Sequence, residues 1–408
     1  MAKLILLLGG CAFALLFLEL GLRVLGIRPS RGPYDPNVAD AVLGMKPVRS
    51  QAQKADFPEY QGTLILQTNN LGFYQAKDTT IEPAHGVLRM VVLGDSFTAG
   101  ASNANENFPS VLEHLLNDAH PLAPVEVLNA GVGRYGPYQS YVLLQHEILP
   151  LKPKHVIVAE YVGNDFLDMI RQDDRPYLTE RPGGTFESHP PRFVYYEDPS
   201  AGPGLLDHSR LYAVLKGLAG PTVRYQYSRV RIMHENLSNF GYGNETIAGY
   251  ILEVAKLDRI AHGMMLEILH QQVWFDRFPA TLPLSLKINR QVIGMYRELC
   301  RSQGIRLTYT VIPSADMIEP ELMQDTFAQL QAHDSKWNPR RIAALDERLT
   351  NETMQACREL GVEYVDLRDG LRRRKTGARM YYPRDLHMNP AGYRAVAEIL
   401  ASALLAKK

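Results

Sequence analysis

The sequence predicts an α/β protein built around a mainly parallel sheet of five strands, with helices on both faces. Two observations lead to this fold class. Hydrophobic residues make up 46% and charged residues 22% of the 408 residues, which is typical of a globular chain and excludes a disordered or fibrous one. From residue 88 onward, short apolar runs alternate with helical patterns, and this alternation is typical of a parallel sheet covered on both faces.

The five expected strands are short apolar runs separated by helical patterns. The first run ends at Gly94, and the third has the sequence HVIVAEY. The expected strands are Leu88–Leu93, Val125–Leu128, His155–Tyr161, Ile305–Ile312 and Val362–Leu367. The expected helices lie around Phe108–Leu116, at Tyr138–Leu149, Ile288–Ser302 and Arg341–Leu360, and from Ala391 to about Leu405.

A nearly uninterrupted apolar segment, Leu4–Leu22, precedes the globular part and contains one acid, Glu19. About 20 apolar residues are enough to cross the hydrocarbon core of a bilayer. We therefore predict that residues 1–24 form a transmembrane anchor. Two alternatives are a signal peptide cleaved after Ala12-Phe13-Ala14, which has the small-residue spacing of a cleavage site, and a lipid attached to Cys11.

Two further regions lack the strand–helix alternation. Residues 25–86 are rich in Pro, Gly, Asn and Gln and are predicted to be an extended arm or linker. A long stretch between the third and fourth strands, about 168–287, is predicted to be an insertion in which Ile247–Gln272 is helical. The remaining residues of 87–408 are predicted to form a single catalytic domain.

Composition excludes several classes of function. Lys+Arg and Asp+Glu both number 44, so the net charge of zero provides no overall field that would attract nucleic acid. Three cysteines are too few for a disulfide scaffold. Cys300 and Cys357 each lie four residues before a glycine that ends a helix, and we interpret both as helix-packing residues. The sequence has no HExxH motif and no Cys/His cluster, so neither a metal nor a cofactor is expected.

A serine follows the first strand directly, in the sequence Gly94-Asp95-Ser96-Phe97-Thr98-Ala99-Gly100. Open α/β sheets bind ligands at the carboxyl ends of their strands. The backbone amides that follow the serine are free to face an anion. Ser96 is therefore a candidate nucleophile, although a serine that merely caps a helix would have the same sequence.

An acid and a histidine lie just before the last helix, in the sequence Asp385-Leu386-His387. Asn389 is a suitable N-cap and Pro390 a suitable first helical residue, so the pair lies on the preceding loop. In an extended segment, residues i and i+2 point the same way. Asp385 is thus predicted to orient His387, and a histidine oriented by an acid can activate a serine hydroxyl. A metal-binding pair or a surface loop would explain the same residues.

Two more blocks follow the second and third strands and would supply hydrogen-bond donors. They are Asn129-Ala130-Gly131-Val132-Gly133 and Gly163-Asn164-Asp165. Backbone amides and an Asn side-chain amide are suitable donors for the oxyanion of a tetrahedral acyl intermediate. Gly133 and Asn164 are the candidate donors, with the backbone amide of Arg134 as the alternative to Gly133.

With these four blocks in this order, the chain resembles the SGNH (GDSL) hydrolase superfamily over roughly 88–405, apart from the insertion. The resemblance implies a flavodoxin-like three-layer α/β/α fold and a catalytic triad of Ser96, His387 and Asp385. It also implies that Asn164 and the Ser96 amide are oxyanion donors. The segments Asn69–Phe73 and Glu19–Arg23 resemble the N-terminal parts of membrane-anchored bacterial members.

Two departures from the family pattern bear on function. Many members have D-x-x-H, but here Arg384 stands at that acid position and the acid precedes His387 by two residues. This shorter form resembles the alginate O-acetylation proteins. Five residues after Asn129, where many members have an oxyanion glycine, this chain has Arg134.

The resemblance implies a serine esterase acting on O-acyl esters of cell-envelope glycans or lipids, and we rank this function first. The alternatives are an O-acetyltransferase of an exported polysaccharide and a non-catalytic, membrane-tethered binding or assembly protein. Expected partners are an ester-bearing small molecule or glycan, the membrane and an envelope protein. The resemblance places the globular domain in the periplasm, whereas the arginines that follow the apolar segment favour a cytoplasmic domain by the positive-inside rule.

Two other sequence patterns indicate possible ligand-binding sites. Gly131–Gly136 contains G-x-G-x-x-G, and Glu160 ends the next strand, as in dinucleotide-binding proteins. However, the motif follows the second strand rather than the first. The basic stretch Arg372–Lys375 indicates either a solvated surface loop or a site that attracts an anionic substrate or headgroup.

Overall fold

The structure is a computed structural model. It describes residues 37–55, 57–192, 234–257, 263–333, 337–375 and 377–406, and isolated residues at 10, 14–15, 17–21, 231 and 261. Most of the predicted anchor Leu4–Leu22 lies outside the described residues. Among those that are described, no helix is both long and apolar enough to cross a membrane.

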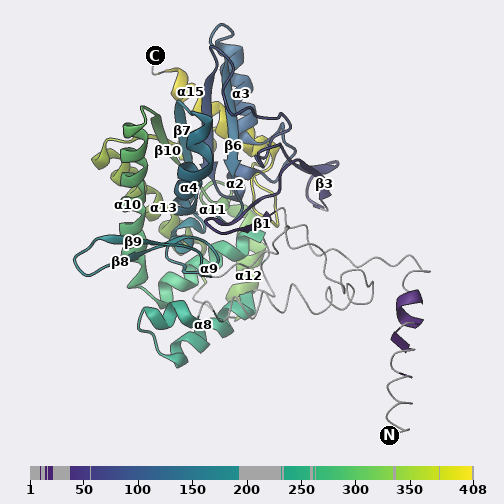
Figure 1. The fold of residues 1–408 in the computed structure, drawn as a ribbon. Coiled ribbons are helices and arrows are strands. Elements are labelled where there is room, and N and C mark those ends of the chain that lie inside the picture. The colour runs from purple at the N-terminus through teal and green to yellow at the C-terminus, as the bar shows by residue number, and fades with distance from the viewer. Residues whose placement is uncertain are drawn as a thin grey trace.

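The centre of the fold is a parallel sheet of five strands, as predicted (Figure 1). The strand order is β6-β5-β7-β10-β11. Numbered by their order in the chain, these strands are 2-1-3-4-5, which is the flavodoxin-like arrangement. The order reverses between β5 and β7, and ligands of such folds bind at the carboxyl ends of the strands at this point. The strands are β5 (Leu88–Gly94), β6 (Val125–Gly131), β7 (His155–Tyr161), β10 (Arg306–Ile312) and β11 (Glu363–Asp366).

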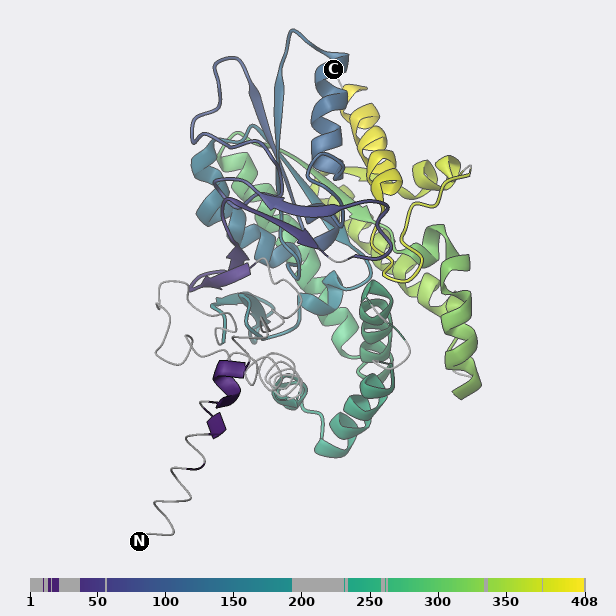
Figure 2. The ribbon, with the colours of Figure 1, turned by 90° about the vertical axis from the view of Figure 1, so that its right-hand side faces the viewer.

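Helices cover both faces of the sheet, which confirms the predicted layers. Figures 1 and 2 show α3 and α15 side by side on one face, and α4, α10 and α13 on the other. These helices are α3 (Phe108–Ala119), α4 (Pro137–Leu143), α10 (Thr281–Ser302), α13 (Pro339–Leu360) and α15 (Pro390–Leu405). The helix expected at Tyr138–Leu149 is regular only as far as Leu143; a π-turn (Leu144–Ile148) and a 3₁₀ turn (Leu149–Leu151) follow.

Short elements connect these layers at the carboxyl end of the sheet and beyond β10. They are α2 (Ser96–Ala99), α5 (Asp165–Asp168), α11 (Ala315–Ile318), a 3₁₀ turn (Pro320–Met323), α12 (Gln324–His333) and α14 (Arg368–Arg374).

The predicted arm contains regular structure, unlike the linker that its composition indicated. Two antiparallel hairpins pair β1 (Asn37–Asp40) with β2 (Gly44–Pro47), and β3 (Gln51–Ala55) with β4 (Leu64–Thr68). Leu43, Met45 and Phe73 from this region are buried in the main hydrophobic core. The arm therefore packs on the sheet domain, because these apolar side chains are buried in the same core as the sheet. The division into anchor, arm and catalytic domain stays a prediction.

The insertion contains a hairpin, β8 (Tyr177–Glu180) with β9 (Phe186–His189), and two helices, α8 (Asn244–Leu257) and α9 (Gly263–Arg277). The region Ile247–Gln272, expected to be helical, is divided between these two helices. α9 begins at Gly263, whose φ of 57° lies in the left-handed region that favours glycine.

Both predicted packing cysteines are buried and free, Cys300 in α10 and Cys357 in α13. Burial raises the pKa of Cys300 to about 12 and also raises that of Cys357. Such thiols are unreactive at neutral pH, which agrees with their interpretation as packing residues.

Candidate active site

Ser96 lies at the first turn after β5, at the carboxyl end of the sheet. Asp95 caps the short helix α2 that Ser96 begins, and its Oδ1 accepts a hydrogen bond from the Phe97 amide at 2.8 Å. Strand register aligns Gly94 with Ala159 of β7 on one side and with Gly131 of β6 on the other. Because Ser96 follows Gly94 by two residues, it lies near the ends of β6 and β7, the strands that precede the other motif blocks. Its side chain is half-buried.

The structure brings Ser96, His387 and Asp385 together in one hydrogen-bonded chain. His387 Nε2 lies 2.9 Å from Ser96 Oγ, although 291 residues separate them in sequence. His387 Nδ1 lies 2.5 Å from Asp385 Oδ1. Each imidazole nitrogen thus faces the partner that the sequence predicted for it.

The local geometry of the Asp-x-His loop differs from the extended segment we expected. Leu386 has φ of 66°, so the chain turns between Asp385 and His387. Its side chain is fully buried, and its amide donates to the Tyr382 carbonyl at 3.1 Å. Asp385 Oδ1 also accepts the His387 backbone N–H at 3.1 Å. A tight turn therefore brings the carboxylate to the imidazole.

Two regions far away in sequence hold this loop, and sequence reasoning identified neither. The carboxylate of Glu59, in the arm, accepts the backbone N–H groups of Arg384 at 2.8 Å and Asp385 at 2.9 Å. At the start of α9 in the insertion, the Met264 amide donates to the Asp385 carbonyl at 2.8 Å. A Cβ on Gly263 would come within 2.5 Å of the Asp385 carboxylate, so a larger residue would displace the loop.

The ionisation of the triad follows from burial and from these close charges. Burial lowers the pKa of His387, but the charge of Asp385 and its hydrogen bond outweigh burial and raise that pKa above 6.5. Burial likewise raises the pKa of Asp385, and the facing imidazolium outweighs it and lowers that pKa. Asp95 is fully buried, which raises its pKa to about 7. Asp385 is therefore the ionised partner of His387 near neutral pH.

The candidate oxyanion donors follow β6 and β7, and Gly133 lies beside Ser96. A Cβ built on Gly133 would lie 3.9 Å from Ser96 Cβ. The next residue, Arg134, has φ of 73°, a left-handed conformation that usually belongs to glycine. Both candidate amides, those of Gly133 and Arg134, therefore lie in the turn between β6 and α4, and the choice between them stays a prediction.

Asn164 follows β7 and is buried. Its Nδ2 donates to Asp168 Oδ2 at 3.1 Å, which uses one of its two N–H bonds and leaves the other available. Its carbonyl oxygen has no hydrogen-bond partner among the described residues. Asp168 lies one helical turn further on, and sequence reasoning did not identify it.

The dinucleotide-binding interpretation of Gly131–Gly136 does not fit the structure. A Cβ on Gly131 would lie 2.2 Å from the Ala99 amide, so this glycine allows α2 to pack over the end of β6. Glu160 is buried, and its carboxyl group accepts a hydrogen bond from Asn289 of α10 at 3.2 Å. Burial raises its pKa to about 8. Glu160 is therefore a core residue and does not face a ligand.

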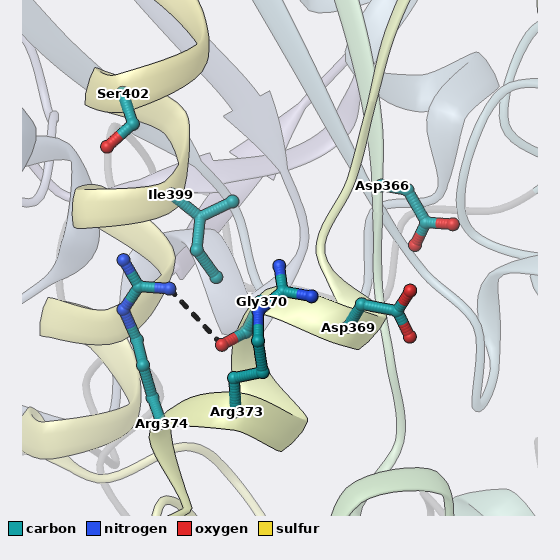
Figure 3. Close-up of a pocket in the computed structure, with 7 residues that line it drawn as sticks. All are labelled: Asp366, Asp369, Gly370, Arg373, Arg374, Ile399 and Ser402. Atoms are coloured by element: carbon teal, nitrogen blue, oxygen red, sulfur yellow. Dashed lines mark hydrogen bonds between the residues drawn. The ribbon is translucent and has the colours of Figure 1, made fainter.

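The basic stretch Arg372–Lys375 forms the last turn of helix α14 and the residue that follows it. Most of its side chains form ion pairs with acids. Arg374 contacts Glu398 at 3.2 Å, and Lys375 contacts Glu321 at 2.7 Å. Figure 3 shows Arg373 and Arg374 at a pocket of about 410 Å³ between α14 and α15, with Asp366 and Asp369 on its other side. Carboxylates in the lining oppose binding of an anion, which favours a solvated surface.

No group of three or more His, Cys, Asp or Glu side chains within the described residues could hold a metal ion. What the geometry offers is a hydroxyl, a general base and amide donors at one end of the sheet, which suits acyl transfer through a serine.

Residues 284–408 match a family model described as "SGNH hydrolase-like domain, acetyltransferase AlgX". No curated protein sequence matches the chain.

Solved structures that match the chain include an alpha/beta hydrolase enzyme from the metagenome of Lake Arreo, Spain. It is 12% identical with a TM-score of 0.38, and the match covers 78% of this chain and 94% of that one. A catalytic mutant of an acetylxylan esterase from Geobacillus stearothermophilus is 11% identical, with a TM-score of 0.36 and coverage of 77% and 93%. A lipase/acylhydrolase from Enterococcus faecalis is 13% identical, with a TM-score of 0.36 and coverage of 78% and 96%.

The family match covers the last two strands of the sheet and the loop that bears Asp385 and His387. The five-stranded parallel sheet supplies the rest of the expected fold. Residues 284–408 are thus similar to an SGNH hydrolase-like domain of the type described for acetyltransferase AlgX.

Proposed function

We propose that this protein is a serine O-acetyltransferase that transfers an acetyl group to a hydroxyl of a cell-envelope glycan. The observation that carries the acyl chemistry is the hydrogen-bonded chain from Ser96 through His387 to Asp385, with distances of 2.9 Å and 2.5 Å. The description of the matched family as an acetyltransferase supports transfer over hydrolysis, which we ranked first from the sequence.

In the proposed reaction, Ser96 Oγ attacks the carbonyl carbon of an acetyl donor while His387 Nε2 accepts the hydroxyl proton. The tetrahedral intermediate collapses when its C–O bond to the leaving group breaks, and His387 returns the proton to that group. This leaves an acetyl ester on Ser96. A sugar hydroxyl then attacks the ester carbonyl and gives its proton to His387. The bond between the carbonyl carbon and Ser96 Oγ breaks, His387 returns the proton to Oγ, and the acetylated sugar leaves.

The donors available to the oxyanion are the Ser96 amide, the Asn164 side chain and a backbone amide of the Gly133–Arg134 turn. We assign the last role to Arg134, because its φ of 73° is the glycine-like conformation at the family's oxyanion position. Each such donor contributes about a hundredfold to a thousandfold to kcat in related chemistry.

Hydrolysis of a glycan ester is the second candidate, and the exposure of the site supports it. Ser96 is only half-buried, so water can reach an acyl group on it. The two reactions share every step up to the acyl-enzyme and differ only in which hydroxyl resolves it. Transfer requires a bound acceptor that excludes water.

An acceptor assay separates the two candidates. The purified protein is incubated with 4-nitrophenyl acetate and a panel of neutral and uronic acid oligosaccharides, and products are identified by mass spectrometry. We expect acetylated oligosaccharide that is absent with the Ser96→Ala variant. Free acetate with no acetylated sugar would favour hydrolysis. If Ser96→Ala and the parent protein released nitrophenol equally, the enzyme would not use this serine, and a binding or assembly function would be favoured.

We also propose that residues 1–24 anchor the enzyme in a membrane with its catalytic domain on the periplasmic side. The length and apolar character of Leu4–Leu22 support the anchor. An acetyl donor would then have to reach that side of the membrane, so we propose that an envelope protein supplies it. Protease treatment of spheroplasts tests the orientation, since a periplasmic domain is digested and a cytoplasmic one is protected.

A further inference from the structure

One buried guanidinium, that of Arg175, is bonded to both sides of the proposed oxyanion site. On one side its Nη2 donates to Asp168 Oδ1 at 3.2 Å, and the other oxygen of Asp168 accepts the Asn164 side-chain amide at 3.1 Å. On the other side its Nη1 donates to the carbonyl oxygen of Arg134. The two donor groups come from different strands, and this side chain links them.

Arg175 is itself held rigidly. Asp173 accepts two hydrogen bonds from it, from Nε at 2.9 Å and from Nη2 at 2.6 Å. Only 2% of Arg175 is exposed, so it cannot contact a substrate directly. Burial raises the pKa of Asp173, but the charge of Arg175 outweighs burial and lowers it, so this pair is ionised. A buried ion pair is weak evidence for stability alone, because desolvation opposes it.

The Arg134 turn shows what this arrangement does. A non-glycine residue with φ of 73° is strained and persists only where its surroundings fix it. Hydrogen bonds at both its side chain and its carbonyl hold it here. The Arg134 guanidinium binds both oxygens of Asp174, at 3.0 and 2.8 Å, and Arg175 holds the Arg134 carbonyl. The amide of a residue so fixed keeps a constant direction, and the preceding residue, Gly133, lies beside Ser96.

We propose that Arg175 is a positioning residue that sets the orientation of both oxyanion donors, the Asn164 amide and the Arg134 turn. The inference rests on the proposed function, because it assumes an acyl intermediate on Ser96. It assigns a role to the start of the insertion, from which Asp168 and Arg175 both come. Preorganised donors stabilise the transition state more than the bound substrate, so loss of Arg175 should lower kcat and leave KM nearly unchanged.

The test compares Arg175→Lys with a matched control in the purified full-length protein. Arg89→Lys is the control, because Arg89 is also a buried arginine, is paired with Glu126 at 2.7 Å, and lies at the opposite end of β5 from Ser96. We measure kcat and KM for 4-nitrophenyl acetate and the inhibition constant of phenylboronic acid, which forms a tetrahedral adduct with serine. We expect Arg175→Lys to lower kcat about tenfold to a hundredfold and to weaken boronic acid inhibition similarly. KM should change less than about twofold, and Arg89→Lys should leave all three values near those of the parent.

Two results would overturn the inference, and they differ. If the parent protein shows no turnover that depends on Ser96, the proposed function is wrong and the inference falls with it. If the parent is active and folded Arg175→Lys retains its kcat, only the inference is wrong. Should Arg175→Lys fail to fold, Asp168→Asn decides the matter, because it keeps the side-chain shape but cannot accept from both Asn164 and Arg175. Unchanged kcat in Asp168→Asn would then overturn it.

Discussion

Substitution of Glu59 by glutamine tests whether the arm supports catalysis. The Glu59 carboxylate accepts two hydrogen bonds from backbone N–H groups, that of Arg384 at 2.8 Å and that of Asp385 at 2.9 Å. Glutamine keeps one acceptor oxygen and turns an NH₂ group toward the other donor. The variant therefore loses at least one hydrogen bond to a charged acceptor, which contributes about 1.5–3 kcal/mol.

This energy sets the size of the expected effect on activity. If all of it serves to hold the loop of Asp385 and His387 in place, kcat falls between about tenfold and a hundredfold, because 1.36 kcal/mol corresponds to a factor of ten. The assay is turnover of 4-nitrophenyl acetate at several pH values, with thermal unfolding measured in parallel. KM should stay within about twofold, since Glu59 bonds only to the backbone of the loop.

The matched control is Glu82→Gln. Glu82 is an exposed acid of the same arm, and it pairs with Lys152 on the surface at 2.5 Å. Exposed ion pairs contribute little, so this variant should behave like the parent protein. Full activity in folded Glu59→Gln, or an equal loss in Glu82→Gln, would refute the idea that Glu59 supports the catalytic loop.

The remaining predictions concern the triad and the anchor. Ser96→Ala and His387→Ala should each abolish ester turnover without changing the unfolding temperature by more than a few degrees, and retained turnover in either variant would exclude this triad. Asp385→Asn should cost a large but smaller factor, up to about 10⁴ in kcat, because it disturbs only the orientation and charge of the imidazole; a silent Asp385→Asn would point to another acid. The pKa of His387 is raised above 6.5 and the base must be neutral, so kcat/KM should rise with pH and reach half its maximum above pH 6.5. Asp385→Asn removes the charge that raises this pKa, so its residual activity should have its half-maximum at lower pH. Removal of residues 1–24 should release the protein from membranes during carbonate extraction; a parent protein that is already soluble and begins near Leu15 would indicate a cleaved signal peptide instead.

The features of the fold that depend on local patterns could be predicted from the sequence. Alternating apolar runs and helical patterns predicted the five strands of the sheet and the helices beside them. Caps were equally informative: Asn389 Oδ1 accepts the amides of Ala391 and Gly392 at 2.9 and 3.1 Å, so α15 begins at Pro390, as expected. Because each motif block follows a strand of a parallel sheet, their meeting at one end of the sheet could also be predicted. Ser96, His387 and Asp385 were found in this way.

The residues that hold the catalytic loop and the oxyanion turn in place could be identified only from the tertiary structure. Glu59 precedes Asp385 by 326 residues and Met264 precedes it by more than a hundred, and neither belongs to a motif. The left-handed turn at Arg134 could likewise not be predicted, because Asp174 and Arg175, which hold it, come from the insertion. Local sequence encodes hydrogen bonds within a helix or a turn. Contacts between distant segments depend on how the arm and the insertion pack on the sheet, and this packing arises only when the whole chain buries its apolar surface.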